Sequence, residues 1–390
     1  MNFFRPAVFV LSKIVFCPFI IAAQVSNQST SLAADRYVSV DGHKMHYQTA
    51  GGGRATVVFE NGHGDNLFEW DDIFFDVAKF AKVVRYDRMG YDRSEATNQA
   101  RTLKQIATEL HSMLHRANIA PPYILVGHSM GGAIIRAFAY LYKDETAGFV
   151  FVDPFNEFET NGMGKKEIEN ELNSADSMLR PGPPNIFEEF QTLKQEILSG
   201  FPELHSFDTL PDVPSILLIA GKRRPPNWQK NLVDFYETKM AKLSESKSII
   251  LPQSTHYIQR NDPVMVIESI RRVVFPNAEN ILSKTLDEKG VDSCIALYKK
   301  LKSIYPKDLL REGVLNTLGY EILGQRDTKG AIALFSLNVA IYPQSYNTYD
   351  SLAEAYMDAG NKKEAIKNYR KSLALNPLNM NAEKMLKKLK

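Results

Sequence analysis

The chain contains the sequence Tyr123-Ile-Leu-Val-Gly127-His128-Ser129-Met130-Gly131-Gly132. Its first four residues form an apolar run that is typical of a short buried strand, and residues 133–142 favour a helix. A Gly-x-Ser-x-Gly pattern between a strand and a helix predicts a sharp turn with the serine at its tip. Small residues flank such a turn because the backbone packs closely there. We therefore expect Ser129 to be a nucleophile, with Gly127 and Gly131 leaving room for the turn.

Strand and helix signals alternate on both sides of this turn. Residues 36–50 alternate around Asp41-Gly42, which predicts a β-hairpin. The strand-then-helix order of the following residues indicates a parallel sheet in an α/β fold. The expected strands are 56–60, 82–87, 123–126, 148–153, 215–220 and 247–252, and the expected helices are 68–80, 102–117, 133–142, 228–243 and 264–275.

Residues 154–213 interrupt this alternation. They are mostly helical in pattern and contain 12 Asp/Glu against four Lys/Arg, a net charge of −8. A long insertion in a compact α/β domain is usually a functional lid, so we expect a cap over Ser129. Its charge either repels anionic substrates or faces solvent. An apolar pocket wall is expected from Phe155, Phe158, Leu179, Phe187, Phe190 and Phe201.

The C-terminal part shows an internal repeat of 34 residues. Matching residues at this offset include Leu318 and Leu352, Ala331 and Ala365, and Pro343 and Pro377. This period, with small residues where helices touch, resembles the tetratricopeptide repeat. Residues 287–390 are therefore expected to form an all-α repeat domain, with an earlier partial repeat at 291–306 and a closing helix at 382–390. Repeats of this kind imply a protein or peptide partner.

Composition supports two modules and an exported chain. The 390 residues carry a net charge of +2, which gives no reason to expect nucleic-acid binding. Residues 281–390 have a net charge of +6 and residues 1–280 of −4. Residues 1–34 resemble a secretory signal peptide: residues 14–23 are apolar but short for a membrane span. Cleavage is expected after Ala23 or Ala34, giving a periplasmic or secreted protein, and an uncleaved anchor is the alternative.

Only one cysteine remains once the predicted signal peptide is removed. Cys17 lies inside that segment and Cys294 lies in the repeat region. A single cysteine cannot form an intramolecular disulfide, so oxidation is not expected to stabilise the fold.

The order of these parts resembles the α/β-hydrolase superfamily over about residues 36–275. The resemblance implies a mostly parallel sheet with a helical cap insertion, in a domain spanning 35–278. It also implies a serine, an acid and a histidine in that order, which Ser129 and His256 fit. His256 follows the last expected strand and would take the proton of Ser129. His128 is expected to pack under the turn instead.

The acid of this triad is less defined. Many family members place it after the strand that follows the insertion, but residues 221–233 contain no carboxylate, and the next one is Asp234 in an expected helix. Others place it after the strand that follows the serine helix, where Asp153 stands. A buried carboxylate there would orient the histidine and stabilise the imidazolium. We favour Asp153, with Glu157 as the alternative.

Two further segments resemble family motifs. Asn61-Gly62-His63-Gly64 resembles the loop that supplies an oxyanion-hole N–H, with asparagine where histidine is commoner. The two donors would be the backbone N–H groups of His63 and Met130. The His63 imidazole either lines the pocket or faces solvent. Residues 87–94 resemble a bracing turn beside the active site, in which Asp92 replaces a glycine.

The resemblance implies an exported, carboxylesterase-like serine hydrolase that cleaves a small acyl substrate through an acyl-enzyme. A serine at the elbow argues against epoxide-hydrolase or dehalogenase chemistry, which uses a carboxylate nucleophile. The sequence shows no zinc spacing, P-loop or dinucleotide motif, so no metal or cofactor is expected. The alternatives are an aminopeptidase-like or lactonase-like hydrolase, or a catalytically inactive interaction protein.

Overall fold

The computed structural model describes residues 33–53, 55–179, 183–222, 226–243, 245–306 and 309–389. Nearly all of the predicted signal peptide lies outside these ranges, so its cleavage and the export of the chain stay predictions. The chain divides into two compact units, one up to Val274 and one from Phe275 onward. None of the helices in the described ranges combines the length and the apolar character that crossing a bilayer demands.

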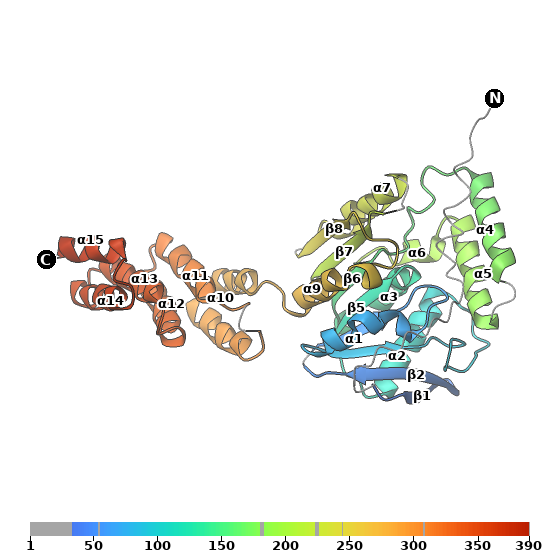
Figure 1. The fold of residues 1–390 in the computed structure, drawn as a ribbon, viewed down its shortest axis with the longest axis horizontal. Coiled ribbons are helices and arrows are strands. Elements are labelled where there is room, and N and C mark those ends of the chain that lie inside the picture. Colours follow the sequence, from blue (N-terminus) through green and yellow to red (C-terminus); the bar gives the residue numbers. More distant parts are fainter. Residues whose placement is uncertain are drawn as a thin grey trace, which may run out of the picture. The chain divides into compact units, whose positions relative to one another are not determined.

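The first unit is built on an eight-stranded sheet with the strand order β1-β2-β4-β3-β5-β6-β7-β8 (Figure 1). β2 is antiparallel to β1 and to β4, and every other neighbouring pair is parallel. The expected mostly parallel α/β sheet is therefore confirmed. The strands are β1 (Arg36–Val40), β2 (His43–Ala50), β3 (Thr56–Glu60), β4 (Lys82–Tyr86), β5 (Tyr123–His128), β6 (Thr146–Val152), β7 (Ser215–Ala220) and β8 (Ser246–Leu251).

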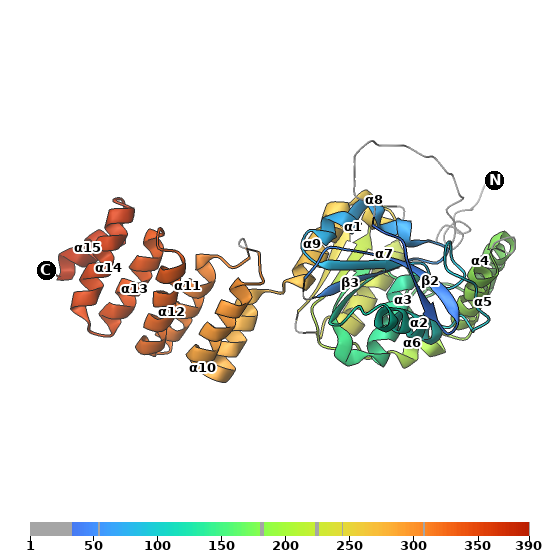
Figure 2. The ribbon, with the colours of Figure 1, turned by 90° about the horizontal axis from the view of Figure 1, so that it is seen from below.

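Helices cover both faces of this sheet (Figure 2). On one face, α2 (Leu103–Arg116), α3 (Met130–Leu141) and α7 (Pro226–Phe235) enclose a core that includes Leu110, Phe138 and Leu217. On the other, η2 (Leu67–Trp70), α1 (Asp71–Ala78), α8 (Ile258–Asn261) and α9 (Pro263–Val274) enclose a second core. Two short elements complete this unit, the 3-10 turn η3 (Lys143–Glu145) and the π-helical turn η4 (Tyr236–Met240).

The insertion between β6 and β7 is helical, as expected. It contains α4 (Lys165–Leu179), α5 (Pro184–Leu198) and α6 (Pro202–Ser206), with α4 packed beside α5 (Figure 1). Phe155, Phe190 and Phe201 are buried, and Phe158 and Phe187 are half-buried. The side chain of Leu179, expected in the same wall, lies outside the described part.

Several carboxylates of the insertion bind protein groups instead of facing solvent. Glu203 accepts hydrogen bonds from the N–H groups of Leu103 and Lys104 at the start of α2. Glu196 in turn accepts from the N–H groups of Glu203 and Leu204. These contacts tie α6 to the start of α2 and to α5, which anchors the cap on the helical layer.

The second unit consists of helices in antiparallel pairs. α10 (Ala278–Lys302) is two helices joined at Gly290, whose φ is 77°. Residues 279–286, which fall between the two domains expected from the sequence, lie in the first of these helices. Three matching pairs of the 34-residue repeat are buried, namely Leu318 and Leu352, Ala331 and Ala365, and Phe335 and Tyr369, whereas Pro343 and Pro377 are exposed. The further helices are α11 (Glu312–Gly324), α12 (Thr328–Ile341), α13 (Tyr346–Asp358), α14 (Lys362–Leu375) and α15 (Met380–Leu389).

Candidate active site

Ser129 stands at a sharp turn between β5 and α3, as expected. Its φ of 51° and ψ of −122° are strained for a residue with a side chain. A Cβ on Gly127 would lie 2.6 Å from the carbonyl oxygen of Gly131, and a Cβ on Gly131 would lie 2.4 Å from that of Glu60. Both glycines are therefore required by close backbone packing on either side of the serine.

Asp153 and His256 meet beside this turn. Asp153 follows the end of β6, is fully buried, and has a φ of 47°. Its Oδ1 accepts a hydrogen bond from the N–H of Ala220 at 3.0 Å, and its Oδ2 lies 2.6 Å from Nδ1 of His256. The carboxylate therefore holds the proton of the imidazole on Nδ1, which leaves Nε2 as the basic nitrogen.

Backbone hydrogen bonds join the serine turn to the loop that carries Asp153. The N–H of Ser129 donates to the carbonyl of Val152 at 3.2 Å, and the N–H of Phe155 donates to the carbonyl of Ser129 at 2.8 Å. His128 links the same turn to the histidine loop, since its Nε2–H donates to the carbonyl oxygen of His256 at 3.0 Å. Ser129, Asp153 and His256 are thus gathered at the carboxyl edge of the sheet.

Glu157, the alternative acid, has a different partner. Its carboxylate is buried and accepts two hydrogen bonds from the guanidinium of Arg136, at 2.6 and 3.1 Å. Burial raises the pKa of Glu157, but the charge and hydrogen bonds of Arg136, a backbone hydrogen bond and the charge of Lys239 together outweigh it, and the pKa is lowered. Glu157 therefore contributes a buried ion pair beneath the cap, and Asp153 is the carboxylate that contacts His256.

The loop after β3 lies against the serine turn. The N–H of Gly62 donates to Glu69 at 2.9 Å, and that of Gly64 lies 3.4 Å from the hydroxyl of Tyr91. The N–H of His63 lies between these two. Met130 opens α3, so its N–H has no acceptor within the helix. These are the two donors expected for an oxyanion hole.

The imidazole of His63 faces the cap. Its Nε2–H donates to the carbonyl oxygen of Ile186 in α5 at 3.0 Å, and its ring lies 6.1 Å from that of Phe190. Burial lowers the pKa of His63, so the ring is neutral near pH 7. The sequence left open whether this side chain lines the pocket or faces solvent. In the structure it is covered by α5 of the cap and does not face solvent.

Two family models match the chain. Residues 55–205 match the alpha/beta hydrolase fold, and residues 346–379 match the tetratricopeptide repeat. The chain contains an alpha/beta-hydrolase fold domain and, near its C-terminus, a tetratricopeptide repeat.

Relatives of this hydrolase-fold chain are distant. It is 26% identical over 238 residues to the uncharacterized protein YqjL of Bacillus subtilis (strain 168), covering 60% of this chain and 88% of the relative. It is 26% identical over 125 residues to a 2-hydroxy-6-oxo-6-(2'-aminophenyl)hexa-2,4-dienoic acid hydrolase of Metapseudomonas resinovorans, covering 32% of this chain and 43% of the relative. The substrate in that name belongs to that protein alone.

Two solved structures that resemble part of the chain do so at low sequence identity. A serine hydrolase involved in carbazole degradation, CarC, is 16% identical, with a TM-score of 0.44 over 61% of this chain and 97% of that chain. Est816, described as an N-acyl homoserine lactone degrading enzyme, is 16% identical, with a TM-score of 0.41 over 60% of this chain and 99% of that chain.

A buried polar network lies beneath the hydrolase-domain site. Nδ1 of His128 forms an ion pair with Glu69, whose other oxygen holds the N–H of Gly62. Burial lowers the pKa of His128, but the charge and hydrogen bond of Glu69 and the charges of Asp65 and Asp153 together outweigh it, and the pKa is raised. Gln259 donates to Glu69 at 2.6 Å. This network holds the loop after β3 in place, and only the burial of His128 was expected from the sequence.

A second buried cluster joins the hydrolase core to its cap. Arg88, in the predicted bracing turn, contacts Glu60 at 2.9 Å and Glu189 of α5 at 2.5 Å. The same guanidinium donates to the carbonyl oxygens of Asn61 and Gly62 in the oxyanion loop. Sequence reasoning identified the turn but missed Glu189, because nothing in the local pattern distinguishes it from the other cap carboxylates.

The bracing turn forms despite its missing glycine. Asp92 has a φ of 36°, close to the left-handed region, which aspartate tolerates better than most residues. Asp87, at the start of the turn, accepts a hydrogen bond from the N–H of Leu67 at 2.9 Å and lies 2.6 Å from Nδ1 of His46.

Proposed function

We propose that the chain is a serine hydrolase that cleaves an ester-type acyl bond through an acyl-enzyme. The observation that carries the proposal is the 2.6 Å contact between Asp153 and His256 beside a serine held at a φ of 51°. A buried acid, a histidine with its tautomer set, and a strained serine are the three parts that such a nucleophile requires.

In the proposed mechanism, Ser129 Oγ attacks the substrate carbonyl while Nε2 of His256 takes its proton. Asp153 stabilises the imidazolium that forms. The negative oxygen of the tetrahedral intermediate is held by the N–H groups of His63 and Met130. His256 then gives its proton to the leaving alcohol, and the acyl-enzyme is hydrolysed by a water that His256 activates in the same way.

The substrate that we propose is a small or medium neutral acyl ester. The cap provides buried aromatic groups, of which Phe190 lies near the oxyanion loop. Glu157 and Glu189 of the cap segment are neutralised by Arg136 and Arg88. These buried cap charges are therefore compensated, and apolar contact is the interaction that this wall offers to an acyl chain.

Fluorophosphonate labelling tests the proposed nucleophile. Wild-type protein should be labelled on Ser129, and Ser129→Ala should not be labelled. Labelling of both proteins at the same level, or of neither, would contradict the proposal, and the second result would favour a non-catalytic interaction protein. Short neutral p-nitrophenyl esters should be turned over faster than esters with an anionic acyl group; the reverse order would reject the substrate class alone.

For the repeat unit we propose protein or peptide binding. Tetratricopeptide repeats bury their small residues between helices and leave a concave face for a partner. Removing residues 276–390 should leave the labelling rate of Ser129 unchanged and abolish capture of a partner. A large loss of labelling in soluble, folded truncated protein would show that the repeats support the hydrolase domain instead.

A further inference from the structure

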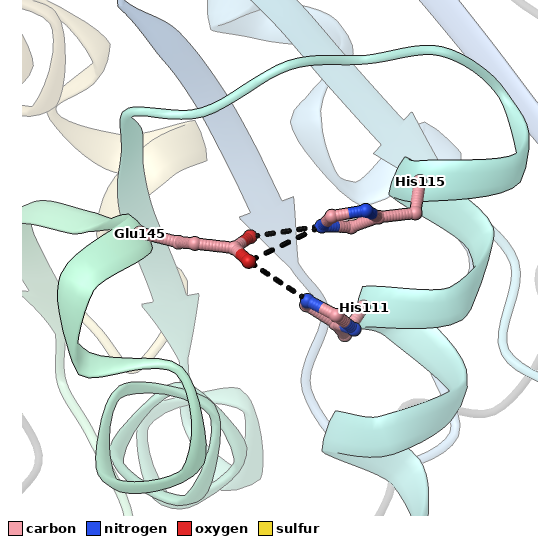
Figure 3. Close-up of side chains that lie close together, drawn as sticks. All are labelled: His111, His115 and Glu145. Carbon is pink, nitrogen blue, oxygen red and sulfur yellow. Dashed lines mark hydrogen bonds and ion pairs between the residues drawn. The ribbon is translucent and has the colours of Figure 1, made fainter.

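Two histidines of α2 and one glutamate form a cluster outside the candidate active site. His111 and His115 are four residues apart and therefore project from the same face of the helix. Both point toward Glu145, which belongs to η3, the short turn between α3 and β6 (Figure 3). The cluster joins two elements that are 30 residues or more apart in the sequence.

The ligand atoms are spaced as a metal ion requires. Nε2 of His111 lies 3.1 Å from Oε1 of Glu145, and Nε2 of His115 lies 3.0 Å from Oε2. The three atoms lie within 4.8 Å of one another. Metal–ligand bonds of about 2.0–2.2 Å in a tetrahedral site place neighbouring ligand atoms about 3.4 Å apart. A small outward shift of Glu145 therefore suffices to admit an ion.

Packing holds this arrangement in place. The ring of His111 stacks on Tyr142 with centroids 3.6 Å apart and an angle of 3° between planes. Glu145 is only partly exposed, and the His115 side chain is about half exposed. Burial alone raises the pKa of Glu145, but hydrogen bonds from both histidines outweigh it and the pKa is lowered. Because the His115 side chain is about half exposed, one edge of the cluster is open to an incoming ion.

We propose that His111, His115 and Glu145 bind a divalent transition-metal ion of the zinc class, with water completing the coordination. Two imidazole nitrogens and one carboxylate form a ligand set that suits zinc. A zinc site was not expected from the sequence, because the third ligand comes from a separate element.

The location gives the site a structural role. The C-terminal end of α2 and η3 lead into β5 and β6, at the amino edge of the sheet, whereas Ser129 and Asp153 follow the carboxyl ends of those strands. The bound ion would therefore clamp α2 to η3 and raise thermal stability without touching the proposed chemistry. This inference is independent of the proposed hydrolase activity.

Two other groups of possible ligands in the described residues are less suited to an ion. In the group of Asp65, Glu69 and His128, Glu69 already binds Gly62 and Gln259. In the group of Glu157, His205 and Asp208, Glu157 is bound by Arg136 at 2.6 Å. The carboxylate at the His111 site has only the two histidines themselves as partners among the hydrogen bonds described.

The test is calorimetric titration of the full chain, carrying no polyhistidine tag, with Zn²⁺ near neutral pH. One equivalent should bind. His115→Ala should lose at least about 100-fold in affinity, because loss of a direct ligand costs no less than loss of an outer partner. The His115 side chain is about half exposed, so the variant should fold. His43→Ala, which removes a histidine outside the cluster, should bind as wild type does.

Three further results decide the proposal. Zn²⁺ should raise the melting temperature of wild type and of His43→Ala, and leave that of His115→Ala unchanged. Affinity should fall as the pH is lowered, because protons compete with a metal ion for its ligand atoms. The proposal would be overturned if wild type bound no Zn²⁺, if His115→Ala bound it unchanged, or if Asp208→Asn, and not His115→Ala, abolished binding. The Ser129 labelling rate with and without Zn²⁺ should agree within about twofold, since the site lies at the opposite edge of the sheet.

Discussion

The replacement Gly131→Ala probes how tightly the serine turn packs against the oxyanion loop. The new Cβ would lie 2.4 Å from the carbonyl oxygen of Glu60 and 2.7 Å from that of Asn61. An ordinary carbon–oxygen contact is about 3.4 Å. The loop or the start of α3 must therefore move by about 1 Å, since both obstacles are backbone atoms that cannot rotate away.

This shift acts directly on the proposed chemistry. The loop carries the N–H of His63, and Arg88 resists its movement by holding the carbonyls of Asn61 and Gly62. A misplacement of about 1 Å costs about 100-fold in rate, and complete loss of an oxyanion donor costs about 100- to 1000-fold. We expect the rate of Ser129 labelling by a fluorophosphonate to fall within this range. Overpacking should also cost about 1–3 kcal/mol of stability.

The assay compares labelling rates of wild type, Gly131→Ala and Gly52→Ala, with circular dichroism to confirm folding. Gly52 is the matched control, because a Cβ there meets nothing within 4 Å. It should label at the wild-type rate. A folded Gly131→Ala protein that labels as fast as wild type would refute the reasoning, because the loop would then tolerate the displacement or would not supply the donor.

Three other predictions follow from single contacts. Asp153→Asn should lower the rate of ester turnover by about 10⁴-fold: the N–H of Ala220 holds the amide oxygen of the new side chain, so its NH₂ group faces His256 and favours the wrong tautomer of the imidazole. Glu157→Gln, the comparison variant, should lower stability far more than rate. Equal losses of rate in the two variants would contradict the assignment of Asp153 as the acid. Burial raises the pKa of Asp65 to about 7, so ionised Asp65 destabilises the folded state fully above that pH, and this destabilisation disappears as the pH falls toward about 4. Asp65→Asn should therefore raise the urea midpoint of unfolding more at about pH 8 than at about pH 5. An equal gain at both pH values would contradict the raised pKa of Asp65. Gly319→Ala should destabilise the repeat unit by about 1–3 kcal/mol, because its Cβ meets the ring of Phe335 at 2.4 Å, whereas Gly324→Ala meets nothing and should be neutral or slightly stabilising in thermal melts.

Local patterns were sufficient for much of the fold. The strand β5, the serine turn and the start of α3 are adjacent in sequence, so their signals occur together. The hairpin at Asp41-Gly42 is confirmed, with φ values of 49° and 87°. The 34-residue repeat is confirmed: residues 346–379 match the tetratricopeptide repeat, and Leu318, Ala331 and Phe335 are buried together with their counterparts 34 residues later. Such features depend on neighbouring residues or on a fixed period, and both are visible in a single chain.

The sequence by itself determined the α/β order, the repeat, and the candidates Ser129 and His256. Only the tertiary structure shows which of the two candidate acids contacts His256: Asp153 meets this histidine, 103 residues away in the sequence, while Glu157 is bound by Arg136. The sequence likewise did not predict the ion pair between Arg88 and Glu189, which are 101 residues apart. It also did not predict the cluster of His111, His115 and Glu145. Partners of a buried charge are chosen by which side chains the packed elements bring within about 3 Å, and no one-dimensional pattern records that proximity.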